Sequence, residues 1–551
     1  MTHNNLIAKL VILSSCITLV LSCNQRQRSP RATQKNLNVP TMDRCVALRG
    51  NGTHAVAHIM SLARITTEWG EIQGIAGGSS ATITSFLYES ILLNPAVRET
   101  EGPARNEAIA MMLKSVIGYM NETMQSPEWS SLKIIGSLAS KLSESGVSSL
   151  PENEYSKVAQ DLRVVLSHEE IRGMVNPEIF GMLVNASSPA FNDHKTKVAE
   201  VKKSVASLTA LDASDPDVFF RPGLLDFPHF VEIVGRISDF YAGFGVDRAG
   251  FSNLIKDCAP GTSDLLWPEI AAKKISGGTC GAKFGALVRA WRSSDDYRLG
   301  RRLKSTPGLA LQSIMTTSVV QDPAALQKIF EYEKLYHQGV ERKLGLSFGD
   351  VKFGYWVSKG FPSDVLDRWA AANPDGKSSK ALSLGEARTW REILEKSPRE
   401  PSLGKYVVFA PGEPAAGSIS LGGWADLHPV QVLKAAGCGK VVYVTRRTPE
   451  TTFISAGKPF EGRKPSGLAE LLGMTAGDYD AIYNLDSKKS AFARALDEAD
   501  GVWCTNWNHF SATEQDGIAM DAWRAPFLTK DPDLKRWRMA MRSPTSIVGC
   551  N

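Results

Sequence analysis

A serine flanked by very small residues lies where the chain could hold a nucleophile. Ser79 is the centre of the run Gly77–Ala81 (GGSSA), between the apolar segment Ile72–Ala76 and the helix-like stretch Thr82–Leu93. A strand, a tight turn with a central serine and then a helix form the layout of a nucleophile elbow, which places the hydroxyl at a helix N-terminus. The pattern predicts that Ser79 is the nucleophile of an acyl hydrolase. The simpler interpretation is a tight strand-to-helix loop.

A second glycine turn supplies candidate oxyanion donors. A nucleophilic serine needs a base that takes its proton and donors that bind the oxyanion. Gly50, Asn51 and Gly52 follow the short apolar stretch Cys45–Leu48 and precede a helix-like segment. Glycines at a helix start let backbone N–H groups approach an anion, so this turn is a candidate oxyanion loop. Alone, it is equally consistent with a phosphate-binding loop or with a turn of no chemical role.

Together, the two turns resemble the first two motifs of the patatin-like phospholipases. The segment Leu421–Val430 resembles the third motif, and the similarity covers roughly Arg44–Leu93 and Val407–Val444. The resemblance implies hydrolysis of lipid ester bonds by a Ser/Asp dyad, without a cofactor or a metal ion. It also implies that Ser79 is the nucleophile and that Gly50–Gly52 form the oxyanion loop.

The sequence departs from the family pattern at the dyad aspartate. Leu421 occupies that position and cannot act as a base, and the nearest carboxylate is Asp426, followed as candidates by His54 and His428. One interpretation is an active enzyme whose base has shifted, with Asp426 as the leading candidate. A second is a catalytically impaired relative that binds lipid, an acyl group or a protein partner. A third is a purely structural role.

The N-terminus predicts export and lipidation. Leu10–Ser22 is an apolar stretch too short for a comfortable transmembrane helix, and it fits the core of a signal peptide spanning residues 1–22. Val20–Cys23 resembles a bacterial lipobox, which implies cleavage before Cys23 and lipidation of that cysteine. Residues 23–40 are polar, as in a flexible tether. We therefore expect a membrane-anchored lipoprotein in the periplasm or at the cell surface; an ordinary signal peptide is the alternative.

The charge and the cysteine content limit the kinds of partner and the cellular compartment that the sequence supports. The chain has 551 residues and a net charge of +5, without a dense Lys/Arg block, so nucleic-acid binding has little support. Lipid or phospholipid is the expected substrate, and the oligomeric state stays open. Export implies an oxidising compartment, and Cys258 with Cys280 is the best candidate disulfide among the six cysteines after Cys23. No cysteine pair has zinc-knuckle spacing, so no structural metal is expected.

The order of strand-like and helix-like segments predicts an α/β fold. Strands and helices alternate in residues 41–100 and again in residues 401–551, which typifies a mainly parallel sheet. The range 101–400 reads as a mostly helical insertion with a mixed segment, including the periodic stretches Leu132–Ser143, Glu154–Ser167 and Thr196–Leu211. We therefore expect a three-layer α/β/α core, as the resemblance implies, interrupted by a large helical insertion and followed by a C-terminal extension.

Overall fold

The computed structural model describes parts of one compact unit that begins at Thr41. The described residues are 42–50, 55–124, 226–259, 279–321, 351–372, 381–399, 407–423, 428–447, 495, 498–506 and 527–528. The expected signal peptide and tether lie outside these residues. So do the three periodic stretches expected as helices between residues 132 and 211.

A ten-stranded mixed sheet forms the centre of this unit. In sheet order its main path is β10 (Phe527–Leu528), β9 (Gly501–Asn506), β8 (Lys440–Arg447), β1 (Arg44–Leu48), β2 (Gly74–Gly78), β3 (Gln312–Val320), β4 (Val351–Val357) and β5 (Ala381–Ser383). Strands β9, β8, β1, β2 and β3 run parallel to one another, whereas β4 and β10 are antiparallel to their neighbours β3 and β9. The short strands β6 (Val407–Val408) and β7 (Ile419–Ser420) pair with each other, and β7 also pairs with β3.

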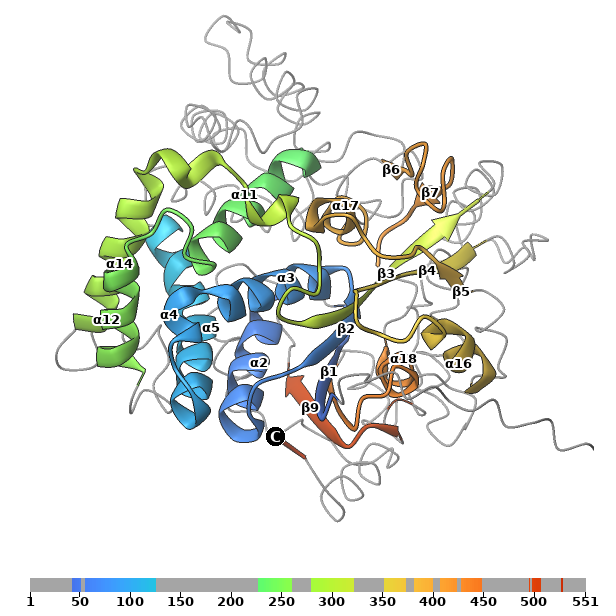
Figure 1. Ribbon diagram of the computed structural model, residues 1–551, viewed down its shortest axis with the longest axis horizontal. Helices are drawn as coiled ribbons and strands as arrows, with labels where there is room; N and C mark the ends of the chain where they lie inside the picture. Colours follow the sequence, from blue (N-terminus) through green and yellow to red (C-terminus); the bar gives the residue numbers. More distant parts are fainter. Residues whose placement is uncertain are drawn as a thin grey trace, which may run out of the picture. The chain divides into compact units, whose positions relative to one another are not determined.

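Helices cover both faces of the sheet (Figure 1). One face carries α2 (Ala55–Trp69), α3 (Ser80–Leu93), α4 (Pro95–Arg98), α5 (Gly102–Met124), α11 (Phe227–Tyr241), α12 (Arg248–Cys258), α14 (Thr279–Arg292), η5 (Arg302–Lys304) and α17 (Trp390–Leu394). The other face carries α16 (Val365–Ala372) and α18 (Val430–Ala435). The α/β prediction is therefore confirmed.

Strand β1 shows why the sheet is buried on both sides. Val46 and Leu48 belong to the core on the α2–α3 face, whereas Cys45 and Ala47 belong to the core on the α16–α18 face. Successive side chains of a strand point to opposite faces, so a strand covered on both faces reads as a continuous apolar run. This is why the short run Cys45–Leu48 could be recognised as a strand in the sequence.

The sheet resumes before residue 400, which the sequence analysis gives as the end of the helical insertion. β3, β4 and β5 lie within the range 101–400, and β3 pairs with β2 in the middle of the sheet. The chain therefore rejoins the sheet by Gln312. Strand β3 was missed because Thr316, Thr317 and Ser318 are fully buried hydroxyl residues, which interrupt the apolar pattern that marks a strand.

Two disulfides join parts of the described chain. One joins Cys258 to Cys280, the pair expected from the sequence, across a separation of 22 residues. The other joins Cys45 in β1 to Cys438, across a separation of 393 residues. A Cβ added at Gly74 of β2 would lie 2.7 Å from the sulfur of Cys45. Glycine at this position therefore makes room for the bridge inside the sheet.

We expect the bridge of long separation to contribute more to stability than the short one. Replacing Cys45 and Cys438 together by alanine should lower the free energy of unfolding by about 2–5 kcal/mol, since the bridge restricts a much longer loop of the unfolded chain. Replacing Cys258 and Cys280 together is the matched control and should cost less. Urea unfolding of the two variants and the wild type measures the difference. An equal or larger loss in the control would contradict the prediction.

Candidate active site

The backbone of Ser79 is held in a conformation that side chains rarely adopt. β2 ends at Gly78 and α3 begins at Ser80, and Ser79 between them has φ 57° and ψ −128°. Among the residues that the structure describes, it is the one non-glycine residue with positive φ. Such a conformation costs about 1–3 kcal/mol and persists where the surroundings enforce it, often at a functional site. The strain and the strand-turn-helix setting together give the geometry of a nucleophile elbow.

The small residues around Ser79 are required by close packing. A Cβ at Gly77 would overlap the Cβ of Ala81 and would lie 3.0 Å from the carbonyl oxygen of Leu48. A Cβ at Gly78 would lie 2.6 Å from the carbonyl oxygen of Gly423. Ala81 is itself fully buried, so its methyl group fills the space that glycine at position 77 leaves open. Alanine at the last position of the elbow is thus compatible with the sharp turn.

The segment Leu421–Gly423 packs directly against the turn at Ser79. A Cβ at Gly423 would overlap the backbone nitrogen of Ser79. The preceding Gly422 has φ 87°, and its carbonyl oxygen accepts a hydrogen bond of 2.7 Å from the Ser318 N–H. The Leu421 N–H donates to the Ser318 carbonyl oxygen at 3.0 Å, and Leu421 is buried. An apolar residue therefore stands two positions from the glycine that touches the serine backbone.

Ser397, which sequence reasoning missed, fixes the amide of Ser79. The Ser79 N–H donates to Ser397 Oγ at 3.0 Å, and Ser397 Oγ donates to the Thr316 carbonyl oxygen at 2.6 Å. Ser397 is fully buried and follows α17. No local motif marks this serine, because its two partners lie far away in the sequence. It connects the segment after α17 to the elbow and to β3.

Removing the Ser397 hydroxyl should therefore loosen the elbow. In Ser397→Ala the partly buried Ser79 N–H loses its acceptor, and we expect the free energy of unfolding to fall by about 1–3 kcal/mol. The control is Ser293→Ala, because Ser293 is exposed and its hydroxyl donates to the carbonyl oxygen of Arg289 in the last turn of the helix that precedes it, α14. Chemical denaturation should show a change within about 0.5 kcal/mol for the control. Equal stabilities of Ser397→Ala and the wild type would refute the role of Ser397.

The start of the expected oxyanion loop lies at the same sheet edge as Ser79. Leu48 of β1 pairs with Gly77 of β2, and the two strands are parallel, so the segments that follow them leave the sheet side by side. Gly50 therefore belongs to this edge. Asn51 and Gly52, as well as the candidate bases Asp426 and His54 and the lipidation residue Cys23, lie outside the described residues. Of the expected site residues, the structure therefore places Ser79 next to the segment Leu421–Gly423.

The remaining candidate base, His428, is engaged elsewhere. It is buried, its Nδ1 is hydrogen-bonded to the Tyr443 hydroxyl of β8, and the two rings meet edge to face with centroids 5.8 Å apart. This contact ties the segment before α18 to the sheet. A structural role therefore accounts for the position of His428.

A buried charge network supports the helix that carries the elbow. Glu89 of α3 and Arg302 of η5 form an ion pair of 2.8 Å, with side chains 0% and 1% exposed. Glu89 also accepts a 2.6 Å hydrogen bond from Trp390 Nε1 of α17, and the backbone N–H groups of Arg301 and Arg302 donate to Asp239 of α11. Burial lowers the pKa of Arg302, and the Glu89 charge opposes this. Burial also disfavours the charged form of Asp239, and it therefore raises the pKa of that carboxyl group.

The described residues give no sign of a metal centre. They contain no cluster of three or more His, Cys, Asp or Glu side chains that could hold an ion. In the same part of the chain, no helix has both the length and the apolar character needed to cross a bilayer. Comparisons with protein-family models, with curated proteins and with solved structures gave no match.

Proposed function

We propose that this protein is a patatin-like serine hydrolase that cleaves acyl esters of lipids or phospholipids at a membrane surface. The backbone of Ser79 carries the proposal, because its strained conformation between β2 and α3 presents a partly exposed serine at the start of a helix. The packing of Gly77 and Gly423 around the turn supports it, because both positions tolerate only a glycine.

In the proposed reaction, Ser79 Oγ attacks the ester carbonyl carbon while its proton passes to a base. The resulting oxyanion accepts hydrogen bonds from backbone N–H groups of Gly50–Gly52. When the intermediate collapses, the base returns the proton to the departing oxygen, so that the alcohol leaves and an acyl-serine remains. Water then attacks the acyl-serine, the base takes a proton from the water and passes it to Ser79 Oγ, and the fatty acid is released. Asp426 is the proposed base, since Leu421 has no group that accepts a proton. No cofactor or metal is required.

We also propose that the chain is an exported lipoprotein, anchored through a lipid on Cys23 at the periplasmic or outer cell surface. The disulfides Cys45–Cys438 and Cys258–Cys280 support this, since structural disulfides persist in oxidising compartments. The anchor would hold the hydrolase beside its membrane substrate.

A second candidate function is binding of lipid or of a protein partner without turnover. The observation that favours it is the buried Leu421 at the position that corresponds to the dyad aspartate. In that case the elbow and its glycine packing would be retained as a binding scaffold, and Asp426 would have no role in proton transfer.

Hydrolysis assays of the full chain carrying Cys23→Ser separate the two functions. We expect release of fatty acid from phospholipid vesicles and of p-nitrophenol from short-chain esters, and a loss of about 10²-fold or more in rate for Asp426→Asn. Adding Leu421→Asp to that variant should restore at least a tenth of the rate, because it returns a carboxylate to the dyad position. An unchanged rate in Asp426→Asn excludes Asp426 as the base.

The wild-type rate itself decides between hydrolase and binder. Lipid binding without measurable hydrolysis in the wild type, followed by hydrolysis once Leu421→Asp is introduced, would favour the second candidate. Absence of both binding and hydrolysis in all variants would contradict both.

A further inference from the structure

Arg399 is a buried arginine whose side chain forms neither an ion pair nor a hydrogen bond within the part of the chain that the structure describes. The residue is 9% exposed. The two carboxylates that act on its charge are engaged elsewhere, since Glu395 pairs with Arg391 and Asp226 accepts a hydrogen bond from the His229 N–H. Burial lowers the pKa of Arg399, and both carboxylates oppose this effect. A buried charge of this kind destabilises a fold unless a ligand or partner compensates it.

The segment that carries Arg399 is attached to the elbow. Ser397, two residues earlier, accepts the hydrogen bond from the Ser79 N–H at 3.0 Å. The Arg399 N–H donates to the Lys396 carbonyl oxygen at 3.3 Å, within the turn that follows α17. Because two residues of extended backbone span about 7 Å at most, Arg399 starts close to the residue that touches the elbow.

The guanidinium of Arg399 lies at the first turn of α11. Its central carbon is 4.8 Å from the centroid of the Phe227 ring. α11 packs beside α3, and Asn94, which follows α3, donates a 2.9 Å hydrogen bond to the carbonyl oxygen of Tyr241 at the end of α11. The buried charge network described above joins the same two helices about one turn earlier. The helices therefore run in the same direction, so the first turn of α11 lies toward the start of α3.

This placement suits recognition of an anion beside Ser79. A guanidinium that stacks on an aromatic ring keeps the N–H donors at its edge, where two of them fit two oxygens of a phosphate. The ring of Phe227 also fixes the guanidinium and so lowers the entropic cost of binding. The N-terminus of α3, which begins at Ser80, adds a partial positive charge at the same end of the helix pair.

We propose that Arg399 is a specificity-determining residue that binds the phosphate group of a phospholipid whose ester lies at Ser79. The inference rests on the proposed site at the elbow, and it names the part of the substrate that the site recognises. Neutral glycerides lack the phosphate, so they would leave the buried charge of Arg399 without a counterion and would bind less well.

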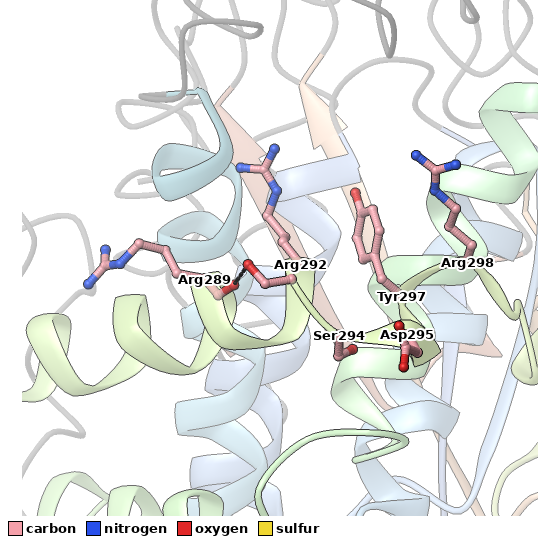
Figure 2. Close-up of a pocket in the computed structure, with 7 residues that line it drawn as sticks. Arg289, Arg292, Ser294, Asp295, Tyr297 and Arg298 are labelled. Carbon is pink, nitrogen blue, oxygen red and sulfur yellow. Dashed lines mark hydrogen bonds between the residues drawn. The ribbon is translucent and has the colours of Figure 1, made fainter.

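Binding is best measured in the full chain carrying Cys23→Ser and Ser79→Ala, so that neither a lipid anchor nor hydrolysis affects the result. Dihexanoyl phosphatidylglycerol is titrated calorimetrically below its micellar concentration, and dihexanoylglycerol is the probe without a phosphate. The test variant is Arg399→Met. The matched control is Arg298→Met, which removes an exposed arginine of the turn η4 (Asp295–Arg298), where it lines a separate hollow of about 600 Å³ (Figure 2).

We expect Arg399→Met to weaken binding of the phospholipid about tenfold or more, because it removes charge-assisted hydrogen bonds to the phosphate. The control should leave binding unchanged. In the chain that retains Ser79, Arg399→Met should lower the ratio of kcat/KM for the phospholipid to kcat/KM for p-nitrophenyl butyrate by a similar factor. Equal binding of the phospholipid by Arg399→Met and its parent, or a parent that binds the two probes equally well or not at all, would overturn the proposal.

Urea unfolding distinguishes recognition of a ligand from a structural role. If Arg399 serves the ligand, Arg399→Met removes a buried charge that lacks a partner, and the midpoint of unfolding should not fall. A lower midpoint together with weaker binding would assign Arg399 to the fold and would contradict the proposal.

Failure of this inference can be told apart from failure of the proposed hydrolase. Phospholipid binding that depends on Arg399, without hydrolysis by the chain that retains Ser79, would support the role of Arg399 and contradict the hydrolase. Hydrolysis with an unchanged substrate preference in Arg399→Met would support the hydrolase and contradict the role of Arg399.

Discussion

Replacing Ser79 with alanine is expected to reduce ester hydrolysis by a factor of about 10³ or more, because the attacking hydroxyl is removed. Its neighbour Ser80 is the first residue of α3 and is buried, so it does not occupy the same place. Initial rates on the p-nitrophenyl ester measure the effect. A variant that keeps more than about a tenth of the wild-type rate would remove Ser79 from the mechanism.

Glycine at position 79 provides a matched control that separates chemistry from strain. Ser79→Gly also lacks the hydroxyl, so its rate should fall as far as that of Ser79→Ala. Glycine adopts positive φ without a steric cost, so Ser79→Gly should raise the free energy of unfolding by about 1 kcal/mol relative to Ser79→Ala. Equal stabilities of the two variants would show that the conformation of Ser79 is not strained.

Breaking the buried ion pair is expected to have the largest effect on stability. Arg302→Met leaves Glu89 buried and without its charge partner, and we expect the free energy of unfolding to fall by about 3–5 kcal/mol. Trp390 Nε1 and the Ala310 N–H still donate to Glu89, but neutral donors do not replace a guanidinium. Urea unfolding measures the loss.

Two further variants make this test specific. Glu89→Leu together with Arg302→Met removes both charges and should cost less than Arg302→Met alone. Arg248→Ala removes one partner of the exposed pair with Glu99, whose side chains are 68% and 46% exposed, and should change stability by less than about 1 kcal/mol. A double variant that is less stable than the single one would contradict the explanation by an unpaired charge.

The elements next to the elbow could be predicted because their signals are local. The run before Ser79 and the periodic stretch after it lie within one continuous segment, and the structure gives β2 and α3 there. Strand β3 could not be predicted in this way. Its central residues Thr316, Thr317 and Ser318 are polar yet fully buried, and only pairing with β2 and β4 makes them a strand.

The same distinction applies to the site. The small residues around Ser79 are visible in the sequence, and so is the Cys258–Cys280 pair, because the partners are near in the chain. Ser397 and Arg302 are not visible, since a single buried serine or arginine has no pattern until its distant partner is known. Their hydrogen bonds nevertheless hold the elbow and α3 in place.

The most direct test of the central claim is the site of covalent labelling by a fluorophosphonate probe. Such a probe reacts with an activated serine and leaves a stable adduct, which peptide mass spectrometry locates. We predict one phosphonyl group on Ser79 of the wild-type protein and none on the Ser79→Ala variant. An adduct on another residue that survives Ser79→Ala, or the absence of any adduct on the wild-type protein, would contradict the assignment of Ser79 as an activated nucleophile.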